Sequence, residues 1–452
     1  MMRIRFYISL FLGRLTYLVL NFLGLNATTF PGKISLYLYS SFLKEIRKYV
    51  NSIILITGTN GKTTTNNLIY QILKSTGYKV LSNLEGANLR TGIITSFLKN
   101  PSYYDYASFE VDEGVFPYVF KELNPKVVVI TNFFRDQLDR YGEIDKTVNS
   151  IYKALENSKV ILVLNADDPF TARFSTLKNK KFFFGIDQNL GSKDYDEVKE
   201  SIYCPFCGER LNYLYFNFAQ LGKFICSCGF SNSNYNFFIK DAEFKNGKWF
   251  FKIKENNEEI SLFFNYGGIY NLYNVIAGFS VGRILEIPEE VIKSTIENFQ
   301  YHLGRLEKFC SKEKEKILVL VKNPAGYNQV LDMVIEDNEE KILLLILNDN
   351  IADGRDISWI WDVDFEKLNR DKNISKIICS GKRAEELLVR LKYAEIPLEK
   401  VELLGSISKS IKKVLEIPKK AYILPTYTAL FYSRKLLLRA TKNEIKHSTY
   451  VS

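Results

Sequence analysis

A glycine-rich loop between an apolar strand and a helix constrains this chain more than any other feature. Ile53 to Ile56 is apolar enough for a buried strand, and Thr63 to Leu73 continues as a helix. The loop reads Thr57-Gly58-Thr59-Asn60-Gly61-Lys62-Thr63-Thr64-Thr65. A strand, a glycine-rich turn and a helix in this order are typical of a phosphate-binding loop in α/β proteins. The sequence therefore predicts an α/β fold with a nucleotide at this turn.

The residue types of the loop suit the β- and γ-phosphates of ATP. Glycines let backbone N–H groups approach phosphate oxygens, and the helix N-terminus adds partial positive charge. Lys62 is placed to contact the outer phosphates and Thr63 to offer its hydroxyl to Mg²⁺. The usual spacing has a glycine where this chain has Ile56, so the loop is a shortened variant. We expect these residues to contact ATP: Gly58, Thr59, Asn60, Gly61, Lys62, Thr63 and Thr64.

Three acidic residues are candidates to complete a magnesium site. Glu110, Asp112 and Glu113 lie within Ser108-Phe109-Glu110-Val111-Asp112-Glu113-Gly114. Mg²⁺ prefers one or two carboxylates together with waters and phosphate oxygens. Acidic residues at a strand end are also often merely solvated, so the residues themselves leave the choice among the three open.

At 452 residues the chain is too long for one core, so two or three domains are expected. Strands alternate with helices in both halves, which favours parallel sheets covered on both faces. The predicted strands after the first are 127–130, 160–164, 317–321, 342–347, 374–379 and 422–424, and the later helices are 384–391 and 428–438. The predicted domains are an N-terminal helical segment (1–50), a central ATP-binding domain (51–300) with an insertion (201–234), and a Rossmann-like C-terminal α/β domain (303–452).

Four of the six cysteines cluster in the insertion, as Cys204-Pro205-Phe206-Cys207 and Cys226-Ser227-Cys228. Two cysteine pairs about twenty residues apart can supply four thiolates to a tetrahedral Zn²⁺. Four protein ligands leave no open position, so we assign this zinc ribbon a structural role. The pattern also indicates a reducing compartment, the cytoplasm. Cys310 and Cys379 are predicted core residues.

The first 25 residues are largely apolar, but Gly13, Arg14 and Asn21 interrupt them, which argues against a spanning helix. One predicted helical face carries Leu12, Leu15, Leu18, Val19 and Phe22. The simpler interpretation is a helix packed on the protein body. The alternative is a membrane-surface helix. The net charge of +10 suggests an anionic partner, but the basic residues are spread along the chain and do not indicate a nucleic acid.

The loop Thr57 to Thr65 resembles the nucleotide loop of the Mur ligases and folylpolyglutamate synthases. Other segments agree with that family: Thr131-Asn132 with Asp136 and Leu138-Asp139, Asn165-Ala166-Asp167-Asp168-Pro169, Tyr270-Asn271-Leu272-Tyr273-Asn274, and Gly304-Arg305-Leu306-Glu307. The resemblance implies that Glu110 is a Mg²⁺ ligand and that Asn271, Asn274 and Arg305 contact the nucleotide. Two departures stand out: Gln137 replaces a common histidine, and no counterpart of a modified lysine is evident. The metal coordination is therefore expected to differ in detail.

The zinc ribbon and three C-terminal motifs narrow the resemblance to the ligase subunits of lipid II isoglutaminyl synthases. The motifs are Lys322 to Asn328, Asn348 to Trp359 and Leu424 to Thr428. The resemblance implies ATP-dependent amidation of the D-glutamate α-carboxylate of lipid II through an acyl phosphate. A GatD-type glutamine amidotransferase subunit would supply the ammonia, and the substrate would place the complex at the inner face of the membrane. It also implies that Asp356 orients the partner's catalytic histidine, so the expected catalytic residues are Lys62, Glu110 and Asp356.

The shortage of histidine supports a partner independently. Release of ammonia from glutamine usually takes a cysteine paired with a histidine. Neither His302 nor His447 lies in a motif that pairs it with Cys310 or Cys379. Two alternatives stay open: a folylpolyglutamate-type ligase, against which the ribbon and the Asp356 loop argue, and a non-catalytic nucleotide-binding scaffold.

Overall fold

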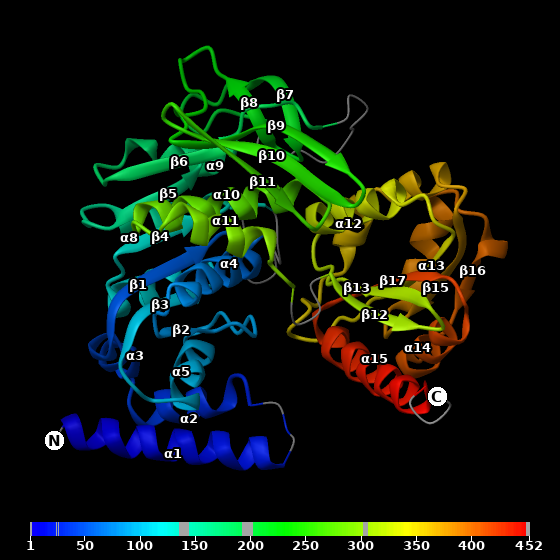
Figure 1. Ribbon diagram of the computed structural model, residues 1–452, viewed down its shortest axis with the longest axis horizontal. Helices are drawn as coiled ribbons and strands as arrows, with labels where there is room; N and C mark the ends of the chain where they lie inside the picture. The colour runs from blue at the N-terminus through cyan, green and yellow to red at the C-terminus, as the bar shows by residue number, and fades with distance from the viewer. Residues whose placement is uncertain are drawn as a thin grey trace. The chain divides into compact units, whose positions relative to one another are not determined.

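The computed structural model describes residues 2–23, 25, 27–134, 144–191, 202–301 and 306–448. They divide into two compact units, of which the first ends at Phe299 and the second begins at Gln300 (Figure 1). Both units are sheets with helices packed on them, so the predicted α/β class is confirmed. Within these ranges, no helix combines the length and the apolarity needed to cross a membrane.

The first unit is built on a nine-stranded sheet in the order β11-β10-β9-β6-β5-β4-β1-β3-β2. Strands β9, β10 and β11 pair antiparallel with one another, and every other neighbouring pair is parallel. The strands are β1 (Val50–Thr57), β2 (Val80–Ser82), β3 (Tyr104–Glu110), β4 (Val127–Ile130), β5 (Ile161–Asn165), β6 (Lys181–Ile186), β9 (Phe237–Lys245), β10 (Lys248–Glu255) and β11 (Glu258–Phe264).

Register brings the carboxyl ends of the central strands together. Ile56 of β1 lies opposite Glu110 of β3, and Thr57 lies opposite Ile130 of β4. Open parallel sheets bind ligands at this edge because loops from neighbouring strands converge there. The predicted phosphate loop, the acidic segment and Thr131-Asn132 therefore start from adjacent strand ends.

Helices cover both faces of this sheet. One face carries α4 (Lys62–Ser75), α10 (Ile269–Ile284) and α11 (Glu289–Glu297). On the other, α3 (Phe42–Ile46), α5 (Arg90–Lys99), α6 (Phe116–Leu123) and α8 (Ile144–Leu155) share a core with alternate strand residues such as Ile53 and Leu55. The shorter elements are η1 (Arg47–Tyr49), α9 (Pro169–Ala172) and η2 (Arg173–Thr176). The period of two along β1 explains the alternation, because successive side chains point to opposite faces.

The chain begins with α1 (Met2–Phe22) and α2 (Phe30–Leu38), which pack on each other and on α5. Ser9 and Ser35, both buried, each donate a hydroxyl hydrogen bond to the other's carbonyl oxygen, at 2.8 and 3.0 Å. At Gly13 a Cβ would lie 2.0 Å from Ser35 Oγ, so a larger residue would have to displace this hydroxyl. Helix α1 thus packs on the protein as predicted, through a face that carries Phe6, Ser9 and Gly13. The predicted face from Leu12 to Phe22 is exposed instead.

Between β6 and β9 the chain forms a separate two-stranded hairpin, β7 (Asn212–Phe218) and β8 (Leu221–Ile225). Cysteines flank it at both ends, and Cys204 and Cys226 share a small core with Leu211, Phe224 and Ala172 of α9. This hairpin lies within the predicted insertion.

The second unit is a six-stranded sheet in the order β12-β13-β17-β14-β15-β16, parallel except between β12 and β13. Helices α14 (Ile407–Glu416) and α15 (Tyr427–Ser448) close a core on one face. The strands are β12 (Glu307–Ser311), β13 (Lys314–Leu318), β14 (Lys341–Ile346), β15 (Ile374–Ser380), β16 (Val401–Leu403) and β17 (Lys420–Pro425). The helices are α12 (Pro324–Glu336), η3 (Ser358–Asp362), η4 (Phe365–Arg370), α13 (Ala384–Tyr393), η5 (Leu398–Lys400), α14 (Ile407–Glu416) and α15 (Tyr427–Ser448).

Two sequence predictions in this unit need correction. The strand expected over 317–321 ends at Leu318, although the Val319 and Val321 amides still donate to carbonyls of the β17 segment. Cys379 is buried as expected, but Cys310 is exposed on β12, because alternate residues of this edge strand face outward.

Candidate nucleotide and metal site

The phosphate loop turns sharply at its two glycines. Gly58 and Gly61 have φ angles of +117° and +83°, values that residues with a side chain rarely adopt. Their surroundings are equally restrictive, because a Cβ on Gly61 would lie 2.0 Å from Asn274 Oδ1. Gly61 also directly precedes α4, so the helix N-terminus opens onto the loop. The expected geometry of a phosphate cradle is therefore present.

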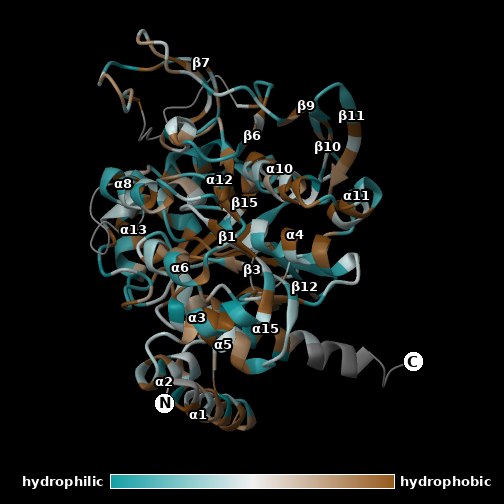
Figure 2. Cartoon of the chain, turned by 90° about the vertical axis from the view of Figure 1, so that its left-hand side faces the viewer, coloured by the Kyte–Doolittle hydropathy of each residue, from teal (hydrophilic) through white to brown (hydrophobic). Residues whose placement is uncertain are grey.

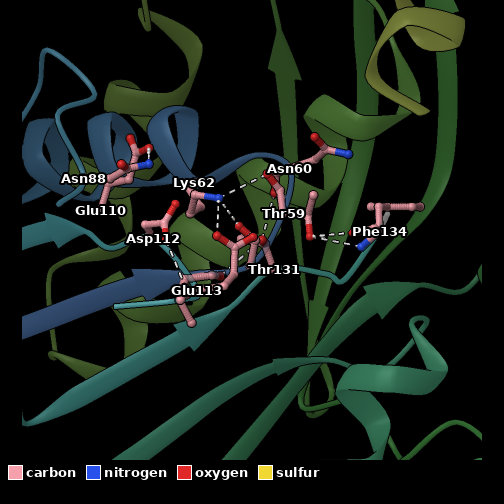
Figure 3. Close-up of polar contacts among 12 residues, drawn as sticks. Thr59, Asn60, Lys62, Asn88, Glu110, Asp112, Glu113, Thr131 and Phe134 are labelled. Carbon is pink, nitrogen blue, oxygen red and sulfur yellow. Dashed lines mark hydrogen bonds and ion pairs between the residues drawn. The ribbon is translucent and has the colours of Figure 1, made fainter. Parts of the chain in front are cut away.

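Lys62 is nearly buried and points back into the loop (Figure 3). Its ammonium donates to the carbonyl oxygens of Gly58 and Thr59 and forms an ion pair with Glu113, with 3.1 Å between Nζ and Oε2. A buried charge needs such partners, since an unpaired one is costly. Glu113, one of the three acidic candidates, therefore holds the lysine rather than lying free in solvent.

The hydroxyl of Thr63 meets the carboxylate of Glu110. Thr63 Oγ1 donates to Glu110 Oε2 at 2.5 Å, and both residues are buried. The other carboxylate oxygen accepts from Asn88 Nδ2 at 3.1 Å, as Figure 3 shows. The Asn83 side chain fixes the Glu110 backbone. Its Oδ1 accepts from the Glu110 N–H at 3.0 Å, and its Nδ2 donates to the Glu110 carbonyl at 2.8 Å. A hydroxyl and a carboxylate held side by side at the end of a phosphate loop are the oxygen donors that Mg²⁺ takes.

Residues after β4 clamp the loop from the opposite side. Asn132 accepts the Thr59 amide with its carbonyl at 2.8 Å and the Asn60 amide with its side chain at 2.9 Å. Thr131 Oγ1 donates to the Asn60 carbonyl at 2.8 Å. Thr59 Oγ1 in turn bonds the backbone of Phe134 in both directions. The Thr131-Asn132 motif thus fixes the shape of the loop through its backbone.

Helix α10 brings Asn274 to the loop. Thr65 Oγ1 lies 3.4 Å from Asn274 Oδ1, and no partner is found for Asn274 Nδ2 among the residues that the structure describes. Asn271 is buried and donates to the Gly267 carbonyl at 2.6 Å, which secures the start of α10. Arg305, the third predicted nucleotide contact, lies outside the described residues, as do Asp136, Gln137 and Asp139.

Two adjacent aspartates are buried completely beneath the site. Asp167 accepts hydrogen bonds from the Tyr235 and Tyr273 hydroxyls at 2.6 and 2.8 Å, and Asp168 accepts the Phe133 amide at 2.9 Å. Burial raises the pKa of each carboxyl to about 6, although these hydrogen bonds lower it in part. The Asn165 to Pro169 motif therefore joins β5, α10 and the segment after β4 into one framework.

The hairpin of the insertion also reaches the site, a contact that sequence reasoning missed. Gln220 is fully buried, and its Nε2 donates to the Phe133 carbonyl at 2.7 Å. Phe218 packs on Phe134, with 5.3 Å between ring centroids. Because Phe134 bonds Thr59, the hairpin is linked to the phosphate loop through two residues. A fully buried glutamine at a hairpin turn is unusual, but its partner is distant in sequence, so no local pattern reveals it.

The four clustered cysteines are arranged as a metal site. All four sulfur atoms lie within 4.8 Å of one another, with 3.6 Å between Cys204 and Cys228 and 3.4 Å between Cys207 and Cys226. Thiolates bound tetrahedrally to Zn²⁺ at 2.3 Å are separated by about 3.8 Å. The cluster therefore fits a four-thiolate zinc site.

In the second unit, the aspartates of the loop after β14 have different surroundings. Asp349 pairs with Arg383, with 2.8 Å from Nε to Oδ2, and buried Asp353 accepts from the Thr428 amide at 2.7 Å. Asp356 is exposed and accepts only from Ser358 among the described residues, which lowers its pKa. It is thus the aspartate of this loop that is most available to another molecule.

Comparisons with known proteins match both halves of the chain. A family model described as the Mur ligase middle domain matches residues 56–225, and one described as MurT ligase C-terminal matches residues 320–430. The lipid II isoglutaminyl synthase (glutamine-hydrolyzing) subunit MurT of Staphylococcus aureus is 38% identical over 408 residues, covering 90% of this chain and 92% of that protein. Its namesake from Streptococcus pneumoniae is 36% identical over 444 residues, covering 96% and 98%.

Solved structures show the same architecture. A pseudomurein peptide ligase type C from Methanothermus fervidus aligns with a TM-score of 0.68 and 26% identity, over 90% of this chain and 84% of that one. MurF ligase from Thermotoga maritima, solved in complex with ADP, aligns with a TM-score of 0.64 at 15% identity, over 92% and 85%. The second likeness concerns the fold alone.

Proposed function

The chain belongs to the family of MurT subunits of glutamine-hydrolyzing lipid II isoglutaminyl synthases, and from that premise we propose that it amidates the D-glutamate α-carboxylate of lipid II. It is a Mur-type ligase that uses ATP and Mg²⁺. In this proposal a GatD-type glutaminase subunit supplies ammonia, and the lipid-linked substrate brings the complex to the inner face of the membrane.

The observation that carries the proposal is the convergence of Lys62, Thr63 and Glu110 at the carboxyl ends of β1 and β3. Lys62 supplies a positive charge for the outer phosphates of ATP. Thr63 and Glu110 would hold Mg²⁺, which neutralises charge on the transferred phosphoryl group when bound. Glu113 keeps the lysine ammonium at the loop, so its position is set before ATP binds.

The reaction has two balanced steps. A carboxylate oxygen of the substrate attacks the γ-phosphorus, the bond to the bridging oxygen of ADP breaks, and an acyl phosphate forms. Ammonia then attacks the acyl carbon, phosphate leaves, and the nitrogen loses a proton to give the amide. Backbone N–H groups of the loop and the start of α4 favour the anionic phosphates throughout.

We assign the four-cysteine cluster to a structural Zn²⁺, supported by the sulfur–sulfur separations of 3.4 and 3.6 Å. With four thiolate ligands the metal has no open position, so it holds the hairpin and takes no part in phosphoryl transfer. Asn271, Asn274 and Arg305 are assigned to the nucleotide, and Asn271 also secures the start of α10 through the Gly267 carbonyl.

The direct test supplies the purified chain with ATP, Mg²⁺, ammonium chloride and lipid II, and mass spectrometry follows conversion of one carboxylate to an amide. Lys62→Ala is expected to lower the rate by about 100-fold or more, because the charge on the outer phosphates is lost. Lys74→Ala, an exposed lysine on the same helix, is the matched control and should be active. Full amidation by Lys62→Ala would refute the assignment.

Asp356 is assigned to the partner's active site, supported by its exposure and by the lack of a distant partner among the described residues. Asp356→Asn should abolish amidation with glutamine while amidation with free ammonia and binding of the glutaminase subunit persist. Asp362→Asn, in the adjoining η3, serves as the control. Equal glutamine-dependent rates for wild type and Asp356→Asn would contradict this role.

A further inference from the structure

One face of helix α1 is apolar and has no partner within the part of the chain that the structure describes. The helix packs on α2 and α5 through the face that carries Phe6, Ser9 and Gly13. The opposite face carries Ile4, Phe11, Leu15, Leu18 and Phe22, which are between 46% and 90% exposed. Their spacing of three, four and seven residues aligns them along one side of a helix. Figure 2 shows this helix coloured largely as hydrophobic.

This exposed stripe is long for a monomeric protein. It runs along α1 from Ile4 to Phe22, about 27 Å at 1.5 Å per residue. Neighbouring α2 adds exposed aromatic residues, with Phe30 at 52% and Tyr37 at 90%. Contiguous apolar surface of this kind marks an interaction site, since isolated exposed residues do not align.

Charge indicates what covers the stripe. The first 44 residues contain five basic residues, Arg3, Arg5, Arg14, Lys33 and Lys44, and no acidic residue before Glu45. Arg5 and Arg14 are exposed on α1. At 3.6 residues per turn they lie on opposite borders of the stripe, one on each side. Lys33 is exposed on α2.

We propose that α1 lies in the surface of a bilayer containing anionic lipids, with the Ile4–Phe22 stripe in the acyl boundary and Arg5 and Arg14 at the headgroups. An apolar face bordered by cationic residues is the arrangement that binds such surfaces. A second copy of the chain is a poorer occupant, because two such faces would bring only like charges together. Binding of α1 to the bilayer would bring the chain close to a lipid-linked acceptor, a consequence that rests on the proposed function. The binding of α1 to the bilayer does not depend on that function.

The test measures co-sedimentation of the full chain, without ATP or lipid II, with phosphatidylglycerol-containing or pure phosphatidylcholine vesicles. Wild type is expected to bind the anionic vesicles at least tenfold more strongly. Arg5→Gln with Arg14→Gln should weaken that binding by about 25-fold, because each basic residue near the surface contributes about fivefold. Phe11→Glu with Leu15→Glu should abolish it.

Val389→Glu with Leu398→Glu is the matched control, since it replaces two exposed apolar residues of the second unit by the same charges. It should bind like wild type, and thermal unfolding should show that all variants fold. Equal binding to both vesicle types, absence of binding to either, or unchanged binding by Phe11→Glu with Leu15→Glu would overturn the proposal. So would a dimer in solution that these two substitutions dissociate.

Amidation assays separate this inference from the proposed function. The Phe11→Glu with Leu15→Glu variant should amidate lipid II in detergent micelles at the wild-type rate, but lose activity on lipid II in vesicles. If the chain binds vesicles but neither wild type nor any variant amidates lipid II, the proposed function is refuted and the membrane binding of α1 is still supported. Equal activity of this variant on vesicles and on micelles would count against the membrane binding of α1 and not against the proposed function.

Discussion

Replacing Gln220 by leucine tests whether the hairpin of the insertion supports the phosphate loop. Leucine keeps most of the side-chain volume but cannot donate to the Phe133 carbonyl, now 2.7 Å from Nε2. A buried acceptor left without a donor costs about 1–3 kcal/mol. Part of this is offset, because Gln220 Oε1 has no partner among the described residues and leucine removes it. We therefore expect a net cost of about 1–2 kcal/mol.

The cost should fall on nucleotide binding, because the Phe133–Phe134 segment bonds Thr59 of the loop. If the whole loss reaches the loop, affinity for a non-hydrolysable ATP analogue drops by about 5- to 30-fold. Isothermal titration calorimetry measures this directly. Denaturant unfolding of the same samples gives the effect on the whole fold.

Gln188→Leu is the matched control. Gln188 exchanges two hydrogen bonds with the Ala242 backbone, at 3.0 and 2.6 Å, and among the described residues it makes no hydrogen bond to the loop. It should lower stability while leaving nucleotide affinity unchanged. An affinity of Gln220→Leu within twofold of wild type, with stability lowered as in the control, would refute the coupling.

Three further outcomes are expected. Gly61→Ala should lose nucleotide binding in calorimetry, since its Cβ would lie 2.0 Å from Asn274 Oδ1 at a φ of +83°; retained affinity would mean that the loop adapts. Cys226→Ser should lower both the zinc content, measured by atomic absorption, and the melting temperature, and it should weaken nucleotide binding as Gln220→Leu does. The pKa of buried Asp168 is raised from 3.8 to about 6, so between these pH values the carboxyl is protonated in the folded state and ionised in the unfolded state. The protonated carboxyl therefore stabilises the fold fully below pH 4. This stabilisation, about 3 kcal/mol, is lost as pH rises through 6. Urea unfolding from pH 4.5 to 6.5 should therefore show a shallower decline for Asp168→Asn, and an identical slope would contradict the shift.

Local patterns in the sequence were sufficient for several parts of the molecule. The strand at Ile53, the turn at Gly58 and Gly61 and the following helix are adjacent in the chain, so their order alone predicts a phosphate loop. The cysteine spacing likewise predicts a sulfur cluster, which the structure contains. For helix α1 the pattern predicted a helix correctly, but the apolar face from Leu12 to Phe22 is exposed and does not pack on the protein. The pattern could not decide this, because an apolar residue suits a core and a membrane surface equally well.

The choices left to the tertiary structure all depend on distant partners. Glu110 meets Thr63 across 47 positions and Gln220 meets Phe133 across 87, so no window of sequence contains either pair. Sheet register decides the first, by placing the ends of β1 and β3 side by side, and hairpin packing decides the second. Sequence alone thus determined the loop and the sulfur cluster, because their parts lie close along the chain. Only folding decided that Glu110 meets Thr63 and that Glu113 pairs with Lys62. Folding also decided which face of α1 is exposed.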